Sequence, residues 1–217
     1  MNFKKFLTLM DTLLSESGCP WDREQTHESL RQYLLEECYE TIDAIDNSDM
    51  AALCEELGDV LLQVVFHSKL AEKAGAFTIE DVISAVSHKL TSRHTHVFGG
   101  DTVTNAEDVI DVWEANKQKE RQHSPAQAME AVPKAFPALM RASKVMKRAS
   151  SDKPEAEGLL QCLRGAIDSL EEAQEGHDKL LGEMLLQVAS LSNVYKVNAE
   201  LALANAVDKF IAQQCQV

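Results

Sequence analysis

Apolar residues recur every three or four positions along nearly all of this 217-residue chain, and no other feature constrains its fold as much. Because Gly and Pro number only 9 and 5, and runs of β-branched residues are scarce, an all-β fold does not fit. We therefore expect an all-α chain. The pattern predicts helices over residues 3–14, 27–46, 50–73, 79–93, 105–122, 155–175 and 178–215, with one short basic helix in the proline-punctuated stretch between them.

Capping signals place several helix ends. Asn47-Ser48-Asp49 is expected to end one helix and begin the next, because these side chains accept hydrogen bonds from free helix N–H groups. Thr78, with Asp81 three residues later, opens another helix, and Gly75 follows the end of the preceding one. In the helix over 27–46, we expect five apolar residues to face the core: Leu30, Leu34, Leu35, Ile42 and Ile45.

The charge of the chain is negative and unevenly distributed. The formal net charge is −14, and residues 1–120 hold 23 acidic against 10 basic side chains. This excess argues against nucleic acid as a partner, since binding to phosphates needs positive charge. The segment 134–148 has five cations and no acid. We interpret it as a linker helix against the acidic first half, with a nucleic-acid or protein contact as the alternative.

Cysteine usage and the absence of targeting signals indicate the cytoplasm. The five cysteines are odd in number and form no CxxC pair, so neither a disulfide framework nor a zinc ribbon fits. The N-terminus resembles no signal peptide, because Asp11 interrupts its apolar run. The longest apolar stretch, residues 60–66, is too short to cross a membrane.

Two stretches recur in the same order in the two halves of the chain. Residues 57–65 match residues 181–189 at six of nine positions, and Ala-Val-Ser-His-Lys at 85–89 returns as Ala-Val-Asp-Lys at 206–209. The pattern predicts a duplicated helical unit, with chance similarity between helical sequences as the alternative.

Five acidic residues form the most promising chemical constellation. Glu36, Glu37 and Glu40 lie in one predicted helix, and Glu56 and Asp59 lie in the next. Residues three or four apart share a helix face, and a short connection makes the helices antiparallel, so the two acidic faces oppose each other. Oxygen ligands of this kind favour Mg²⁺ or Mn²⁺. A solvated acidic surface without a metal remains the alternative.

Other catalytic signatures are absent from the sequence. It contains no GxxxxGK[ST], GxGxxG, HExxH or GxSxG motif. His94 and His96 form a single HxH pair, which fits surface or capping histidines better than a metal site.

The arrangement Glu36-Glu37-x-x-Glu40, fifteen residues, Glu56-x-x-Asp59 resembles the EExxE…ExxD signature of the MazG nucleoside triphosphate pyrophosphohydrolases. Similar neighbouring segments extend the resemblance over about residues 3–148: Gly-Cys-Pro-Trp-Asp at 18–22, Arg-His-x-His-Val-Phe at 93–98 and Pro-Ala-Leu-Met-Arg-Ala at 137–142.

The resemblance implies an all-α NTP pyrophosphatase fold, usually a tight homodimer, that cleaves a nucleoside triphosphate to the monophosphate and pyrophosphate with Mg²⁺, or alternatively Mn²⁺. Nucleotide-pool housecleaning or regulation is the role it implies. By motif position, the metal ligands would be Glu37, Glu40, Glu56 and Asp59, and Glu36 would orient or deprotonate the attacking water. Substrate contacts would come from Lys89, Arg93, Trp113 and Lys117.

The resemblance also divides the chain into an intact catalytic domain over 1–122, a linker with a basic helix over 123–149 and a degenerate, truncated copy over 150–217. In that copy, the EExxE position falls near residues 164–168, where only Asp168 is acidic, and Leu180 and Glu183 replace Glu56 and Asp59. Two alternatives stay open for the chain: a nucleotide- or metal-binding regulator whose catalysis has lapsed, and a structural helical dimer with an acidic groove.

Overall fold

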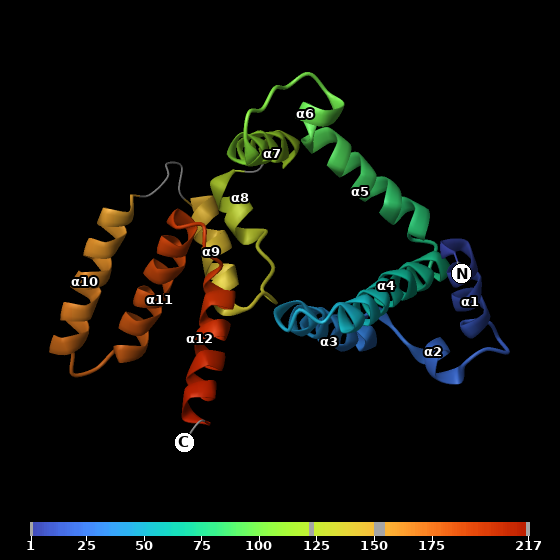
Figure 1. Ribbon diagram of the computed structural model, residues 1–217, viewed down its shortest axis with the longest axis horizontal. Helices are drawn as coiled ribbons and strands as arrows, with labels where there is room; N and C mark the ends of the chain where they lie inside the picture. Colours follow the sequence, from blue (N-terminus) through green and yellow to red (C-terminus); the bar gives the residue numbers. More distant parts are fainter. Residues whose placement is uncertain (1, 122–123, 150–154, 216–217) are drawn as a thin grey trace. The chain divides into compact units, whose positions relative to one another are not determined.

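The computed structural model describes residues 2–121, 124–149 and 155–215. In these ranges the regular elements are all helices, which confirms the all-α prediction (Figure 1). None of the described helices is long and apolar enough to cross a membrane. The helices of the first half are α1 (Phe3–Leu13), α2 (Pro20–Glu24), α3 (His27–Asp46), α4 (Met50–Lys73), α5 (Ile79–Arg93), α6 (Thr95–Phe98) and α7 (Ala106–Arg121). Those of the second half are α8 (Pro125–Glu130), α9 (Ala138–Ala149), α10 (Ala156–Glu172), α11 (His177–Val194) and α12 (Ala199–Gln214).

The chain divides into two compact units, residues 1–117 and residues 118–217. The first unit is organised around α3 and α4, an antiparallel pair joined by a three-residue turn. Ser48 adopts a left-handed conformation in this turn, with φ of 56°. Asp49 then begins α4 by accepting hydrogen bonds of 3.0 Å from the N–H groups of Ala51 and Ala52, as the sequence predicted.

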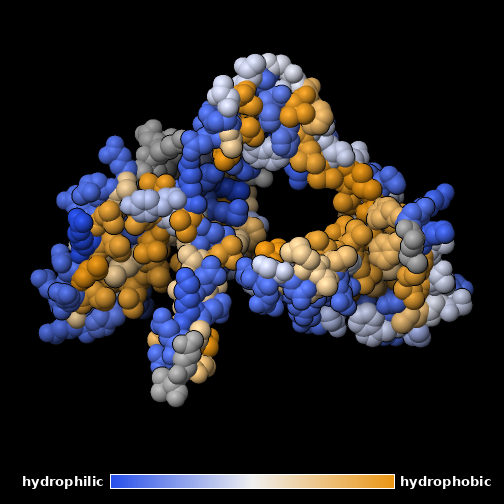
Figure 2. Space-filling view, in the orientation of Figure 1, coloured by the Kyte–Doolittle hydropathy of each residue, from blue (hydrophilic) through white to orange (hydrophobic). Residues whose placement is uncertain are grey.

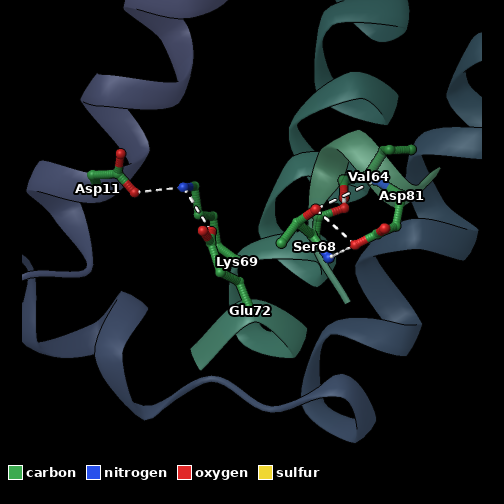
Figure 3. A network of polar contacts seen from close by, with 7 residues as sticks. Asp11, Val64, Ser68, Lys69, Glu72 and Asp81 are labelled. Atoms are coloured by element: carbon green, nitrogen blue, oxygen red, sulfur yellow. Dashed lines mark hydrogen bonds and ion pairs between the residues drawn. The ribbon is translucent and has the colours of Figure 1, made fainter. Parts of the chain in front are cut away.

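The core of the first unit lies where α1, α3, α4 and α5 meet. It consists of Met10, Leu30, Val65, Phe66 and Ile79, all at most 7% exposed. Lys69 on α4 joins α1 to this core: its Nζ lies 2.7 Å from an Asp11 carboxylate oxygen and 2.8 Å from one of Glu72 (Figure 3). Its side chain is only 13% exposed, so the Lys69 ammonium is largely shielded from water, and the two carboxylates neutralise its charge.

The start of α5 is defined by the predicted signals. Gly75, beyond the end of α4, has φ of 71°, a conformation that glycine adopts without strain. Thr78 then caps α5 in a reciprocal arrangement, in which its own N–H donates to Asp81 Oδ2 at 2.8 Å. The rest of α5 continues from this corner toward α6 (Figure 1).

One apolar face of the first unit has no cover within the unit. Leu30 is buried as predicted, but the expectation that Leu35, Ile42 and Ile45 face the core is wrong, since they are 57%, 37% and 53% exposed. The reason is that α3 carries two apolar stripes, and only one packs against the core. Apolar residues of α4 and α5 are also exposed: Leu57, Leu61, Val64, Ile83, Val86 and Leu90. Figure 2 shows hydrophobic surface along these two helices.

The second unit packs α9 and α10 against α11. Ser143 on α9 donates to Asn193 Oδ1 at 2.6 Å, and Asn193 Nδ2 donates back to the Ser143 carbonyl at 2.9 Å. The Glu200 carboxylate accepts from the first free N–H groups of α9, those of Leu139 and Met140. The basic helix expected between the prolines is α9, with the unpredicted α8 before it.

The prediction of one continuous helix over 178–215 is wrong, because the structure has two helices there, α11 and α12. Lys196 adopts a left-handed conformation with φ of 56°, which ends α11, and Asn198 caps a new helix by accepting from the N–H groups of Glu200 and Leu201. A lysine in this conformation gives no sequence signal of the kind that Gly75 gives. Because of this break, each unit contains a helix pair followed by a third helix: α3–α4–α5 in the first unit and α10–α11–α12 in the second.

Candidate metal centre and nucleotide site

Three carboxylates from the two central helices meet in the first unit. Glu37 on α3 and Glu56 and Asp59 on α4 each offer one carboxylate oxygen, and these oxygens all lie within 4.8 Å of one another. All three residues are half-buried. Glu56 and Asp59 share a face because they are three residues apart on a helix, and the antiparallel pairing brings Glu37 opposite them. We call these three residues the carboxylate cluster.

Burial and mutual repulsion both disfavour ionisation within the carboxylate cluster. Burial raises the pKa of the Glu37 carboxyl, and the negative charges of Asp59, Glu40, Glu56 and Glu36 raise it further. Burial likewise raises the pKa of Glu56, followed by the charges of Glu40, Asp59 and Glu55. Each named neighbour is itself an acid. The site therefore concentrates negative charge, and burial together with this repulsion is the main cause of both pKa shifts.

This donor set fits a hard divalent cation. Carboxylate oxygens are the ligands that Mg²⁺ and Mn²⁺ prefer, and a bound cation removes the repulsion that raises the two pKa values. Among the residues that the structure describes, this is the one group of three or more acidic, histidine or cysteine side chains close enough to hold a metal ion.

The remaining two predicted acids lie beside the carboxylate cluster. Glu40 is exposed, one turn beyond Glu37 on α3, and a hydrogen bond with Glu40 contributes to the raised pKa of Glu56. Glu36 is also exposed and raises the pKa of Glu37 through its charge. The structure thus places both acids near the cluster, and both are exposed to solvent.

The predicted substrate-binding residues gather elsewhere in the first unit, around α5 and α7. The guanidinium carbon of Arg93 lies 5.3 Å from the centre of the Trp113 ring, a cation–π contact. Lys117, one turn after Trp113, has its Nζ 3.2 Å from Glu114 Oε1. Lys89 is exposed one turn before Arg93.

His94 belongs to this second group, although the sequence indicated only a surface or capping residue. It ends α5, as a capping residue does, and its ring also lies against Trp113, with ring centres 4.7 Å apart. No periodicity or motif spacing could place it there, because the contact depends on the turn between α5 and α6 and on the return of α7.

The second unit carries no equivalent carboxylate group in its described part. Asp168 on α10 and Glu183 on α11 are both exposed, and Glu183 lies 3.9 Å from Lys179 on its own helix. These acids are arranged as an ordinary solvated helix surface.

Comparison with known proteins agrees with the sequence motifs. Residues 25–98 match the model of the MazG nucleotide pyrophosphohydrolase domain, a range that includes the five acids, Lys89 and Arg93 but ends before Trp113 and Lys117. The chain is 39% identical over 214 residues to a nucleoside triphosphate pyrophosphohydrolase/pyrophosphatase MazG from Thermotoga maritima, covering 96% of this chain and 82% of that protein.

Two further relatives come from other bacteria. A nucleoside triphosphate pyrophosphohydrolase from Escherichia coli is 36% identical over 218 residues, covering 95% of this chain and 83% of its own length. The uncharacterized protein YabN from Bacillus subtilis is 38% identical over 217 residues, which is 96% of this chain and 44% of that protein. With similarity that extends through both units and a carboxylate cluster built from the signature acids, the chain belongs to the MazG family.

Proposed function

We propose that this protein hydrolyses nucleoside triphosphates to nucleoside monophosphates and pyrophosphate, with Mg²⁺ held by Glu37, Glu56 and Asp59 and by the adjacent Glu40. The observation that carries the proposal is the carboxylate cluster, in which oxygens of acids from two helices lie within 4.8 Å of one another and the pKa values of Glu37 and Glu56 are raised. Relatives that are 39% and 36% identical to this chain over 214 and 218 aligned residues are named nucleoside triphosphate pyrophosphohydrolases.

Residues beside the cluster, and others around α5 and α7, suit the attack of water and the departure of pyrophosphate. When bound, Mg²⁺ would neutralise the negative charge of the phosphates and lower the pKa of a water molecule bound to it. Glu36, an exposed acid next to Glu37, is the residue that we assign to orienting or deprotonating the attacking water. Lys89, Arg93 and Lys117 supply positive charge for the triphosphate and the leaving pyrophosphate, and Trp113 supplies a surface for the nucleotide.

We further propose that the protein works as a homodimer through the exposed apolar face of α3, α4 and α5. A monomer that leaves Leu35, Ile45, Leu57 and Leu61 more than 40% exposed on one unit presents an apolar patch of the kind that interfaces cover. A second copy with the same face would bury it in a symmetric contact.

The proposed setting is nucleotide-pool housecleaning in the cytoplasm. All five cysteines are free, which suits a reducing compartment. The direct test is release of pyrophosphate from a panel of the eight common ribo- and deoxyribonucleoside triphosphates with Mg²⁺. Formation of inorganic phosphate and a diphosphate instead would contradict the proposed bond cleavage.

A further inference from the structure

The corner between α5 and α6 is built on a single histidine. His94 is the C-cap residue that follows the end of α5 and directly precedes α6, with φ of −97° and ψ of 55°. Its backbone N–H donates to the Leu90 carbonyl at 3.1 Å, and its ring Nδ1 lies 2.7 Å from the same oxygen. Since a carbonyl oxygen can only accept, Nδ1 carries a proton, and this hydrogen bond fixes the orientation of the ring.

The ring so oriented packs against Trp113 of α7. The two ring centres are 4.7 Å apart with an angle of 64° between the planes, an edge-to-face contact. Arg93, the preceding residue, places its guanidinium 5.3 Å from the centre of the same indole. Neighbouring residues at the end of α5 therefore contact one tryptophan, one through a ring and the other through a cation.

A second contact holds α7 in register with this corner. Asn116, three residues after Trp113 and on the same face of α7, donates from Nδ2 to Thr95 Oγ1 at 2.9 Å. Thr95 in turn donates to Asp101 Oδ2, closing the loop that follows α6. His94, Trp113 and Asn116 are all half-buried, so the arrangement is protected from solvent on at least one side.

We infer that His94 is a positioning residue for substrate binding: its ring, in edge-to-face contact with Trp113, holds the indole where the Arg93 guanidinium rests on it. This inference rests on the proposed function, in which Arg93 and Trp113 contact the nucleotide. An arginine ordered on an aromatic ring before the substrate arrives loses less side-chain entropy on binding a phosphate. His94 itself touches neither the substrate nor the acids in this account.

Two substitutions separate the two contacts of His94. His94→Phe keeps an aromatic ring against Trp113 but loses the donor to Leu90. His94→Asn keeps a donor at the position of Nδ1 but loses the ring. Because the ring contact orders Trp113, the inference predicts that His94→Asn raises KM for the fastest nucleoside triphosphate by about tenfold with kcat changed by less than about twofold. His94→Phe should stay within about threefold of the wild type in both parameters.

Emission from Trp113 supplies a readout that does not depend on catalysis. In the 217-residue chain with Trp21→Phe, Trp113 is the sole tryptophan. His94→Asn should shift its emission to longer wavelengths as the ring gains water, whereas His94→Phe should leave it unchanged, with far-UV circular dichroism alike for both variants. The inference is overturned if His94→Asn leaves both KM and emission as in the wild type, or if His94→Phe is as impaired as His94→Asn. A wild-type chain that hydrolyses none of the eight nucleotides overturns the proposed function, and the emission comparison then still decides whether His94 orders Trp113.

Discussion

Glu37 on α3 and Asp59 on α4 bring carboxylate oxygens within 4.8 Å of each other across the central helix pair, and the charge of Asp59 raises the pKa of Glu37. Two like charges at this separation oppose folding unless a proton or a cation lies between them. The first unit therefore holds at its centre an arrangement that costs stability in the metal-free protein, and this cost is what a divalent cation can remove.

Glu37→Gln is expected to stabilise the metal-free protein while removing its response to Mg²⁺. The pKa of Glu37 is higher in the folded than in the unfolded chain, so its ionised form destabilises the fold at neutral pH, and this cost fades as the pH falls through the raised pKa. At pH 7.5 without metal, the variant should melt about 1–3 °C higher than the wild type. Millimolar Mg²⁺ should raise the melting temperature of the wild type and leave that of Glu37→Gln unchanged.

Calorimetric scans with EDTA and with Mg²⁺, run on both proteins, measure this difference. Equal stabilisation of the two proteins by Mg²⁺ would place the metal away from the carboxylate cluster.

His67 on α4 is expected to make the first unit less stable as the pH falls below neutrality. Its Nδ1 lies 2.8 Å from His27 Nδ1, the ring planes differ by 3°, and the ring centres are 5.1 Å apart. The distance between the ring centres is close to the sum of the Nδ1–Nδ1 distance and the radii of the two rings, so the rings lie edge to edge with the two nitrogens facing each other. One Nδ1 then donates its proton in a hydrogen bond to the other. Burial lowers the pKa of His67, and the charge of His27 lowers it further.

Because the unfolded chain binds a proton on His67 more readily than the folded one, stability rises with pH between the lowered pKa and about 6.5, and is lost as the pH falls through this window. Urea unfolding at pH 7.5 and pH 5.5 should show a smaller loss for His67→Phe than for the wild type. A loss of the same size in both proteins would contradict this role of the pair.

The buried stripe of α3 sets the stability of the first unit. Leu30 is 1% exposed in the core with Met10 and Val65, so Leu30→Ala should lower the free energy of unfolding by about 2–4 kcal/mol through lost burial and a cavity. Leu9→Ala, at a residue 42% exposed on α1, is the control and should cost less than about 1 kcal/mol. Denaturant titrations give both values, and similar losses at the two sites would contradict the assignment of this core.

The second apolar face should control the oligomeric state. Leu61 on α4 is 41% exposed beside Leu57 and Val64, and a charge placed there would be buried without a partner in a symmetric dimer. Leu61→Lys is expected to give monomers in light scattering at micromolar concentration, while Leu61→Met should remain dimeric like the wild type. A wild-type chain that is monomeric at these concentrations would remove the proposed homodimer.

Local signals in the sequence predicted most of the first unit. Asp49, Gly75 and Thr78 act in the structure as their residue types indicated, because capping and left-handed turns depend on neighbouring residues alone. The break at Lys196 escaped prediction because most residues avoid the left-handed conformation, and nothing local marks this lysine as an exception.

The sequence likewise predicted the local part of the candidate site and missed the part that depends on distant contacts. Helix periodicity and the short turn after α3 place Glu37 opposite Glu56 and Asp59. Periodicity alone could not tell which apolar stripe of α3 is buried, so Leu35 and Ile45 were assigned to the core and are exposed. The contact between His94 and Trp113 joins a helix end to a later helix, and such non-local contacts leave no periodic signal.

Pyrophosphate release with Mg²⁺, compared between Asp59→Asn and Glu183→Gln, tests the central claim most directly. Asp59 belongs to the carboxylate cluster, whereas Glu183 holds the matching position of the sequence repeat and is exposed on α11. We predict that Asp59→Asn lowers kcat/KM by about a hundredfold or more, and that Glu183→Gln stays within about twofold of the wild type. Full activity in Asp59→Asn, or its loss in Glu183→Gln, would contradict the assignment of catalysis to the first unit.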